Sequence, residues 1–224
     1  MKLYQLKNKL VLRLAPKAGE FLKAYSSNTL DRPRNAFLDI QGKIVATFDQ
    51  CLLNDDEVLI VIEKQFLNRV QTHLKVYLSL SDVNLNLKDT LIYYDLEGDW
   101  QTQAPDLVIR EKGGSLVLTD RKINSNVSDE DFTLWRLKNN SPIQGIDYDE
   151  ELLLNVGEEE FISFTKGCYL GQEIIARVHH RSKPPKRLVV RAKSECSPEE
   201  WVRATSKVLD PETKTHLGFV FLKV

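Results

Sequence analysis

Apolar and polar residues alternate along the chain in a pattern that predicts short strands interspersed with amphipathic helices. Residues 65–77 place Phe66, Val70, Leu74 and Tyr77 at helical spacing, which predicts a helix with one apolar face. Short apolar runs bounded by turn residues predict strands instead. The predicted helices are residues 16–27, 65–77, 128–139 and 172–180, with a short helix or turn at 197–204. The predicted strands are two within 36–48, then 58–63, 83–87, 91–96, 115–119, 187–192 and 216–223.

The order of these elements indicates how the chain is divided. Residues 51–140 carry a strand, a helix, three strands and a helix, an order that resembles a ferredoxin-like α+β unit. The run Lys183-Pro184-Pro185-Lys186 is a stiff break, so we place a boundary there and a small C-terminal β domain at 184–224. A chain of 224 residues is expected to form about one or two domains.

Composition and charge exclude several classes of protein. Hydrophobic residues make up 42% of the chain and charged residues 28%, as in ordinary globular proteins. A net charge of −1 gives no broad positive field, so we expect no direct, extended nucleic-acid surface. No segment approaches the roughly 20 apolar residues of a membrane span, and the first 16 residues lack a secretory signal pattern. We therefore expect a cytoplasmic protein without membrane contact.

The three cysteines, Cys51, Cys168 and Cys196, are widely spaced and odd in number. This spacing predicts neither a disulfide framework nor a metal site. Cys168 stands out because it lies between two glycines, next to a lysine, and before a helical run. A helix start and a nearby ammonium group both favour a thiolate, whereas a lone cysteine is more often a small buried hydrophobe. Both interpretations stay open. The segment, residues 166–173, reads Lys-Gly-Cys-Tyr-Leu-Gly-Gln-Glu.

This octapeptide resembles the Lys-Gly-Cys-(Tyr/Phe)-x-Gly-Gln-Glu signature of the YgfZ family of folate-binding proteins. That family is related to the aminomethyltransferase (T-protein) of the glycine cleavage system and includes a mitochondrial iron–sulfur assembly factor. Matches to the family run from about 147 to 191, and they include Ser163-Phe164-Thr165 and residues 174–181. The N-terminal half matches more loosely, at residues 21–22, 28, 37–39 and 42–44.

The resemblance implies an α+β, T-protein-like arrangement with a ferredoxin-like insert and a truncated C-terminal β domain. A discontinuous folate-binding domain would then comprise residues 1–50 plus 141–183. The implied role is to bind tetrahydrofolate and to support the assembly or repair of iron–sulfur client proteins, including tRNA-modifying enzymes. Cys168 would act as a thiolate that Lys166 favours. The implied cofactor-binding or loop-shaping residues are Gly167, Tyr169, Gly171, Gln172, Glu173 and Arg177.

The segment from 166 to 187 is basic, with Lys166, Arg177, Arg181, Lys183, Lys186 and Arg187 against the single acid Glu173. Three interpretations stay open for it: it binds the glutamate tail of a folate, it attracts an acidic partner, or it forms a solvated charged face.

The chain departs from T-proteins at two places, and these departures bear on which function it has. T-proteins carry an Asp-Asp pair where this chain has Ala46-Thr47, and a glutamate where it has Lys138. Without a placed acid or base, methylene transfer from a folate nitrogen loses its proton carrier, which argues against glycine-cleavage chemistry. The alternatives are a folate-dependent aminomethyl or one-carbon transferase, and a non-catalytic interaction module that has lost folate binding.

Overall fold

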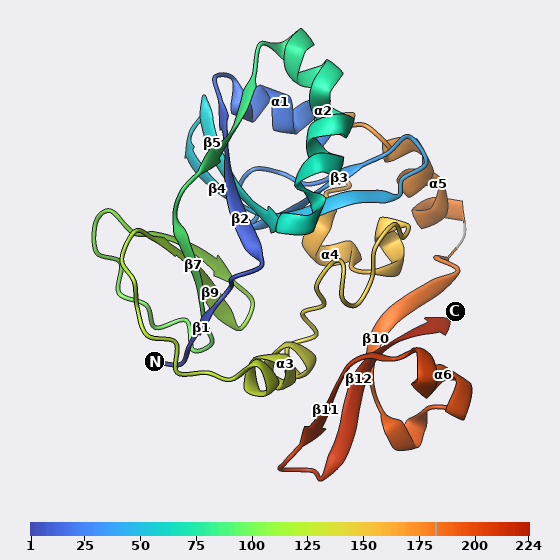
Figure 1. The fold of residues 1–224 in the computed structure, drawn as a ribbon. Helices are drawn as coiled ribbons and strands as arrows, with labels where there is room; N and C mark the ends of the chain where they lie inside the picture. The colour runs from blue at the N-terminus through green and yellow to red at the C-terminus, as the bar shows by residue number, and fades with distance from the viewer. Residues whose placement is uncertain (182) are drawn as a thin grey trace.

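Three antiparallel sheets, connected by short helices, form the chain (Figure 1). The computed structural model describes residues 1–181 and 183–224, and only the backbone of 158, 159 and 181. The five-stranded sheet has the order β3-β4-β5-β2-β6, the four-stranded sheet β1-β7-β9-β8, and the three-stranded sheet β10-β12-β11. The strands are β1 (Leu3–Gln5), β2 (Lys9–Ala15), β3 (Arg34–Leu38), β4 (Ile44–Asn54), β5 (Glu57–Glu63), β6 (Asn84–Lys88), β7 (Leu91–Asp95), β8 (Leu107–Glu111), β9 (Gly114–Thr119), β10 (Lys186–Ala192), β11 (Thr205–Asp210) and β12 (Thr215–Lys223).

In the described residues, six α-helices and three 3-10 helices connect these strands. Ser128 caps α3, the helix predicted at residues 128–139, because its hydroxyl accepts the Asp131 N–H at 3.1 Å. No helix within 1–181 or 183–224 is both long enough and apolar enough to cross a membrane. The α-helices are α1 (Ala18–Tyr25), α2 (Leu67–Ser81), α3 (Asp129–Lys138), α4 (Glu158–Phe161), α5 (Gln172–Arg181) and α6 (Pro198–Arg203), and the 3-10 helices are Lys64–Phe66, Leu153–Asn155 and Lys193–Glu195.

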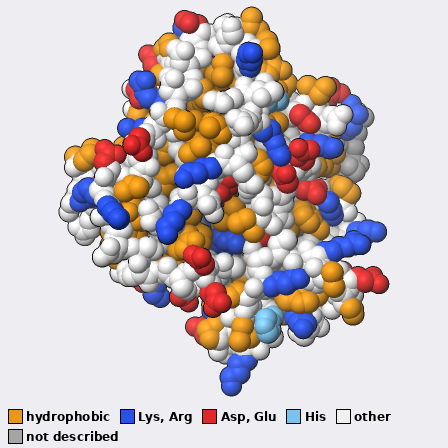
Figure 2. All heavy atoms as spheres, viewed as in Figure 1, with side chains coloured by type: hydrophobic (Ala, Val, Ile, Leu, Met, Phe, Trp, Pro, Cys, Tyr) orange, Lys and Arg blue, Asp and Glu red, His pale blue; other side chains and the backbone are white. Residues whose placement is uncertain are grey.

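Charged side chains of both signs are intermixed on the face of the molecule shown in Figure 2. Lys and Arg side chains lie near the middle of this view, and Asp and Glu side chains are their close neighbours. Opposite charges at such short range cancel within a Debye length of roughly 10 Å, so they create local rather than extended fields. Sites for charged ligands must therefore be sought in individual hollows.

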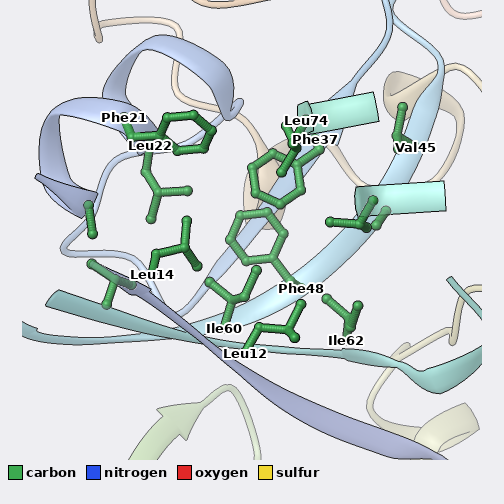
Figure 3. Packing of buried hydrophobic residues seen from close by; sticks show 14 of the residues in the cluster. Leu12, Leu14, Phe21, Leu22, Phe37, Val45, Phe48, Ile60, Ile62 and Leu74 are labelled. Carbon is green, nitrogen blue, oxygen red and sulfur yellow. The ribbon is translucent and has the colours of Figure 1, made fainter. Parts of the chain in front are cut away.

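The largest apolar core lies between the five-stranded sheet and helices α1 and α2 (Figure 3). Val70 and Leu74 of α2 are fully buried against it, which confirms the apolar face predicted for residues 65–77. Phe37 of β3 and Phe48 of β4 contact each other with ring centroids 4.5 Å apart. Such rings bury large apolar areas, so this core fixes the sheet and the helices as one unit.

The sheet order differs from the predicted division at residue 50. Strand β4 runs through that residue, and β2, an N-terminal strand that the sequence pattern did not reveal, pairs with both β5 and β6. The elements expected in one unit at 51–140 are therefore split between two sheets, because β1 likewise pairs with β7. The N-terminal strands combine apolar residues with lysines and an arginine, which hid their periodicity. The division into three domains otherwise remains a prediction.

The C-terminal sheet is attached to the rest of the chain through a buried ion pair. The Arg136 guanidinium on α3 donates to the Asp147 carboxylate at 2.6 Å, and both side chains are almost fully buried. Asp147 also accepts the hydroxyls of Thr205 and Ser206 on β11. Since these groups come from three separate segments, they hold the C-terminal sheet in a fixed position.

Candidate functional site

Cys168 lies on the loop between α4 and α5, and its side chain is exposed. It sits at one end of an open groove of about 710 Å³, which we call the loop groove. Helix α5 begins at Gln172, four residues after the cysteine, so the thiol lies ahead of the first helical turn rather than within it. The groove is lined by Glu20, Lys23, Ala24, Thr29, Leu30, Asp31, Leu52, Asp55, Lys166, Gly167 and Cys168.

Lys166 ties the cysteine loop to the end of α1. Its ammonium donates to the carbonyls of Ser26 at 2.6 Å and Asn28 at 2.9 Å, and it lies 5.2 Å from the centre of the Tyr169 ring. Burial lowers the pKa of Lys166 to about 8. Two of its three N–H donors are used on the backbone, so its contacts make it a positioning residue for the loop.

The other residues predicted near the thiol shape the loop more than they surround a ligand. Tyr169 is buried in an apolar cluster, and its N–H donates to the Gln172 side chain at 3.3 Å. Gly171 has φ +86°, and a Cβ there would lie 2.5 Å from the Asp39 carbonyl oxygen, so only glycine fits. Gly167, by contrast, has open space around its Cα. Tyr169, Gln172 and Gly171 therefore hold the loop against the first sheet.

Glu173 and Arg177 form an ion pair at 2.6 Å on the exposed face of α5. Such an exposed pair at i, i+4 spacing stabilises a helix by about 0.2–0.5 kcal/mol. Neither residue lines the loop groove. The side chain of Arg181, a member of the basic segment, lies outside the described residues.

A second hollow lies at the centre of the molecule, where the two larger sheets meet. This central cavity has a volume of about 50 Å³ and contains a network of ionisable residues. Lys9 contacts Asp49 at 3.1 Å and Glu63 at 3.4 Å. Arg34 contacts Asp49 at 3.5 Å and Glu111 at 2.9 Å. At the rim, Arg34 reaches one more carboxylate, Glu160, at 2.5 Å. In this network Lys9 and Arg34 thus contact four carboxylates, and Arg136 is a third cation in the cavity lining.

Glu111 is the member of this network whose pKa is raised, mainly by burial. Burial raises the pKa of Glu111 to about 7, the neighbouring Asp49 adds to the effect, and the Arg34 guanidinium opposes it. One carboxylate oxygen, Oε2, accepts from Arg34 at 2.9 Å and from the Tyr94 hydroxyl at 3.1 Å. The other, Oε1, is buried and has no hydrogen-bond partner among the described residues. A buried acceptor left in this state favours a ligand that donates.

A wider hollow of about 560 Å³ adjoins the central cavity, and we call it the vestibule. It shares Arg34, Glu111 and Ser141 with the cavity, so Glu111 lies where the two hollows meet. The vestibule is rich in cations although the whole chain carries a net charge of −1. Its lining consists of Arg32, Pro33, Arg34, Arg110, Glu111, Lys112, Asn139, Ser141 and Glu160.

Sequence reasoning pointed to the loop around Cys168 and missed the central cavity. None of the eight predicted site residues lines that cavity, whereas Trp135, one of the three tryptophans, does. Lys9, Asp49 and Glu63 lie within or at the end of apolar strands. Their position in these strands was the sequence feature that could have indicated the cavity. A charged residue inside an apolar strand predicts a buried partner, although the sequence does not identify which one.

A prediction follows from the raised pKa of Glu111. Between about pH 4.5 and 7 the folded protein retains a proton that the unfolded chain has lost, so the stability contributed by Glu111 falls as the pH rises through this window. Glu111→Gln is expected to leave stability near pH 5 almost unchanged and to raise it at pH 8 by on the order of 3 kcal/mol. Urea unfolding at both pH values measures this, with exposed Glu173→Gln as the control. Parallel pH profiles for Glu111→Gln and the unmodified protein would contradict it.

Known proteins share this architecture. No protein-family model matches the chain. It is 26% identical over 220 residues to the mitochondrial iron–sulfur cluster assembly factor IBA57 homolog of Neurospora crassa, covering 78% of this chain and 49% of that protein. It is also 28% identical over 155 residues to an uncharacterized protein of Haemophilus influenzae, covering 65% of this chain and 55% of that protein. The chain thus spans about half the length of these curated relatives.

The crystal structure of glycine cleavage system aminomethyltransferase T from Bartonella henselae superposes with a TM-score of 0.74 at 11% identity. The match covers 99% of this chain and 78% of that one. The chain has the T-protein fold. This confirms the predicted α+β, T-protein-like fold class, and at this identity the likeness extends to the fold alone.

Thr47 and Lys138, at the two places where the sequence departs from T-proteins, both make side-chain contacts in the structure. Thr47 donates its N–H to the Gln144 side chain at 2.8 Å, and its hydroxyl lies 2.8 Å from that of Tyr148. This position therefore presents hydroxyl and amide groups where T-proteins have carboxylates. Lys138 contacts Asp210 at 3.4 Å and Glu212 at 2.5 Å, so it fastens the C-terminal sheet.

Proposed function

We propose that this protein binds a reduced folate, such as tetrahydrofolate, and acts as an accessory factor in the assembly or repair of iron–sulfur proteins, including enzymes that modify tRNA. One observation carries the folate part: Glu111, whose buried Oε1 has no hydrogen-bond partner among the described residues, lines both the central cavity and the vestibule. Two observations support the iron–sulfur part. Cys168 is exposed on an anchored loop, and the chain is similar to a protein named as an iron–sulfur cluster assembly factor.

The lining residues fit a folate in chemistry and in volume. A pterin ring carries N–H donors along one edge, and a buried carboxylate is a strong acceptor for such donors. The central cavity, at about 50 Å³, holds at most a few water molecules. The vestibule, at about 560 Å³, falls within the roughly 300–1,000 Å³ of ligand pockets. The ring would occupy the vestibule and reach Glu111 from there.

The outer part of the vestibule suits the other end of the ligand. Arg32, Arg110 and Lys112 are exposed around it, and guanidinium and ammonium groups form charge-assisted hydrogen bonds with carboxylates. They would hold the glutamate tail of the folate. When bound, the folate supplies the capacity to carry a one-carbon unit, and the protein supplies orientation and exclusion of water.

Cys168 would serve the client protein rather than the folate. The thiol lies at the loop groove, and none of the residues around it lines the vestibule. As a thiolate it can attack a client disulfide, form a mixed disulfide and release the client's second sulfur as a thiolate. Among the alternatives, the one-carbon transferase is disfavoured because Ala46-Thr47 provides no carboxylate.

Titration with tetrahydrofolate tests the folate part. Trp135 lines the central cavity, so its fluorescence is expected to change on binding, and Trp135→Phe is expected to lose the signal. At pH 8, where Glu111 is ionised, Glu111→Gln is expected to weaken binding by about 10- to 100-fold, because a charged acceptor is worth about 1.5–3 kcal/mol. Glu173→Gln, on the far exposed helix α5, serves as the matched control. An unchanged affinity in Glu111→Gln, or no binding by the unmodified protein, would overturn this proposal.

A further inference from the structure

The loop groove has features that the folate site does not explain. Its walls are helix α1, the segment between α1 and β3, the hairpin that joins β4 to β5, and the loop that carries Cys168. Leu52 on the hairpin wall is 42% exposed, and Leu30 and Ala24 also line the groove. A partly exposed leucine thus lies in a hollow beside a free thiol, and exposed apolar patches often mark binding surfaces.

The groove is held open by hydrogen bonds between its walls. On the hairpin side, the Gly19 N–H donates to the Asp55 carbonyl at 3.0 Å. A Cβ on Gly19 would approach that oxygen to 2.8 Å, so the contact requires glycine. On the loop side, the Leu170 N–H donates to the Ala24 carbonyl at 3.2 Å, and Lys166 binds two more carbonyls. A preformed groove binds a partner without the entropic cost of ordering its own walls.

The charges around the groove select its occupant. Glu20, Asp31 and Asp55 line the groove and are exposed. The lining also contains two lysines, Lys23 and Lys166. The ammonium of Lys166 donates to backbone carbonyls, so Lys23 is the lining lysine without these backbone bonds. The groove lining therefore carries three carboxylates against two ammonium groups. Electrostatic complementarity with this lining favours a positively charged partner.

On the basis of the proposed function, we infer that the loop groove docks an extended segment of the client protein that contains a disulfide-bonded cysteine, a large apolar residue and flanking Lys or Arg residues. The apolar side chain contacts Leu52 and Leu30, the basic residues face Asp31 and Asp55, and the cysteine meets Cys168. The groove thus selects which cysteine of a client reaches the thiol.

Synthetic peptides test the groove directly. Each peptide carries one cysteine as its 2-thiopyridyl disulfide. The Cys168 thiolate attacks the peptide sulfur, forms the protein–peptide disulfide and expels thiopyridone, whose absorbance gives the rate. A basic, leucine-bearing peptide (Lys-Leu-Cys-Lys) is compared with an acidic one (Glu-Leu-Cys-Glu) and with one that lacks the leucine (Lys-Ser-Cys-Lys). The basic, leucine-bearing peptide is expected to react about tenfold faster than the acidic one at low salt.

Variants assign the preference to the groove. The double variant Asp31→Lys, Asp55→Lys is expected to reverse the preference between basic and acidic peptides, and Leu52→Ser to abolish the advantage of leucine over serine. Matched controls on other surfaces are Asp89→Lys and Leu209→Ser, and both are expected to react like the unmodified protein. Equal rates for all three peptides would overturn the groove inference and leave the folate titration unaffected. A groove preference without folate binding would instead count against the proposed function.

Discussion

Cells that depend on this protein are expected to lose the activity of its iron–sulfur client enzymes when Cys168 is replaced by serine. The thiol is exposed, and serine has nearly the same shape, so the substitution removes the nucleophile without leaving a cavity. Client enzyme activity in complemented cells measures the effect, and urea unfolding of the purified variant is expected to match that of the unmodified protein.

The other two cysteines provide the matched controls for this loss. Cys51 and Cys196 are both half-buried and lie outside the loop groove, so Cys51→Ser and Cys196→Ser are expected to retain client activity. Normal client activity in cells with Cys168→Ser would contradict a functional thiol. It would leave the folate site, which none of the thiol-loop residues lines, as the remaining candidate.

The separation of the two sites has a consequence for mechanism. The thiol lies at the loop groove beside α1, whereas Glu111 lies between the central cavity and the vestibule. The two hollows share no lining residue, although residues 29–31 line one and residues 32–34 the other. A bound folate and a docked client could therefore occupy the protein together. The short segment from 29 to 34 is the direct covalent path between them.

Local signals in the sequence predicted the features that depend on neighbouring residues. The helix at residues 128–139 and the apolar face of α2 each follow from a few consecutive positions. The role of Lys166 did not, because its partners are carbonyls of Ser26 and Asn28, far away in the sequence. Every residue has a main-chain carbonyl, so the sequence does not reveal which carbonyls Lys166 contacts. The lysine near Cys168 therefore suggested activation of the thiol, whereas in the structure it fixes the loop to the backbone.

The central cavity illustrates the same limit on a larger scale. Lys9, Arg34, Asp49 and Glu111 come from four different strands of two sheets. Their proximity depends on β2 entering the sheet between β5 and β6, and that strand was hidden by its charged residues. Pairing of strands far apart in sequence is set by the whole fold, so no local pattern predicts which charges become neighbours.

Replacing Arg136 by methionine is expected to destabilise the protein by about 3–5 kcal/mol. The substitution leaves the Asp147 carboxylate, whose side chain is fully buried, without its cation. The Thr205 and Ser206 hydroxyls still donate to that carboxylate, but neutral donors compensate a buried charge only in part. Urea unfolding followed by tryptophan fluorescence measures the loss.

Lys138→Met provides the comparison on the same helix. Its partly exposed ion pairs link α3 to Asp210 and Glu212, and exposed pairs contribute about 0–1 kcal/mol. Both variants remove one cation that joins α3 to the C-terminal sheet, so burial is the main difference between them. Equal, small effects would show that Asp147 is solvated or neutralised in another way. A large loss for Arg136→Met alone would show that the buried pair, rather than the surface lysine, fixes the C-terminal sheet.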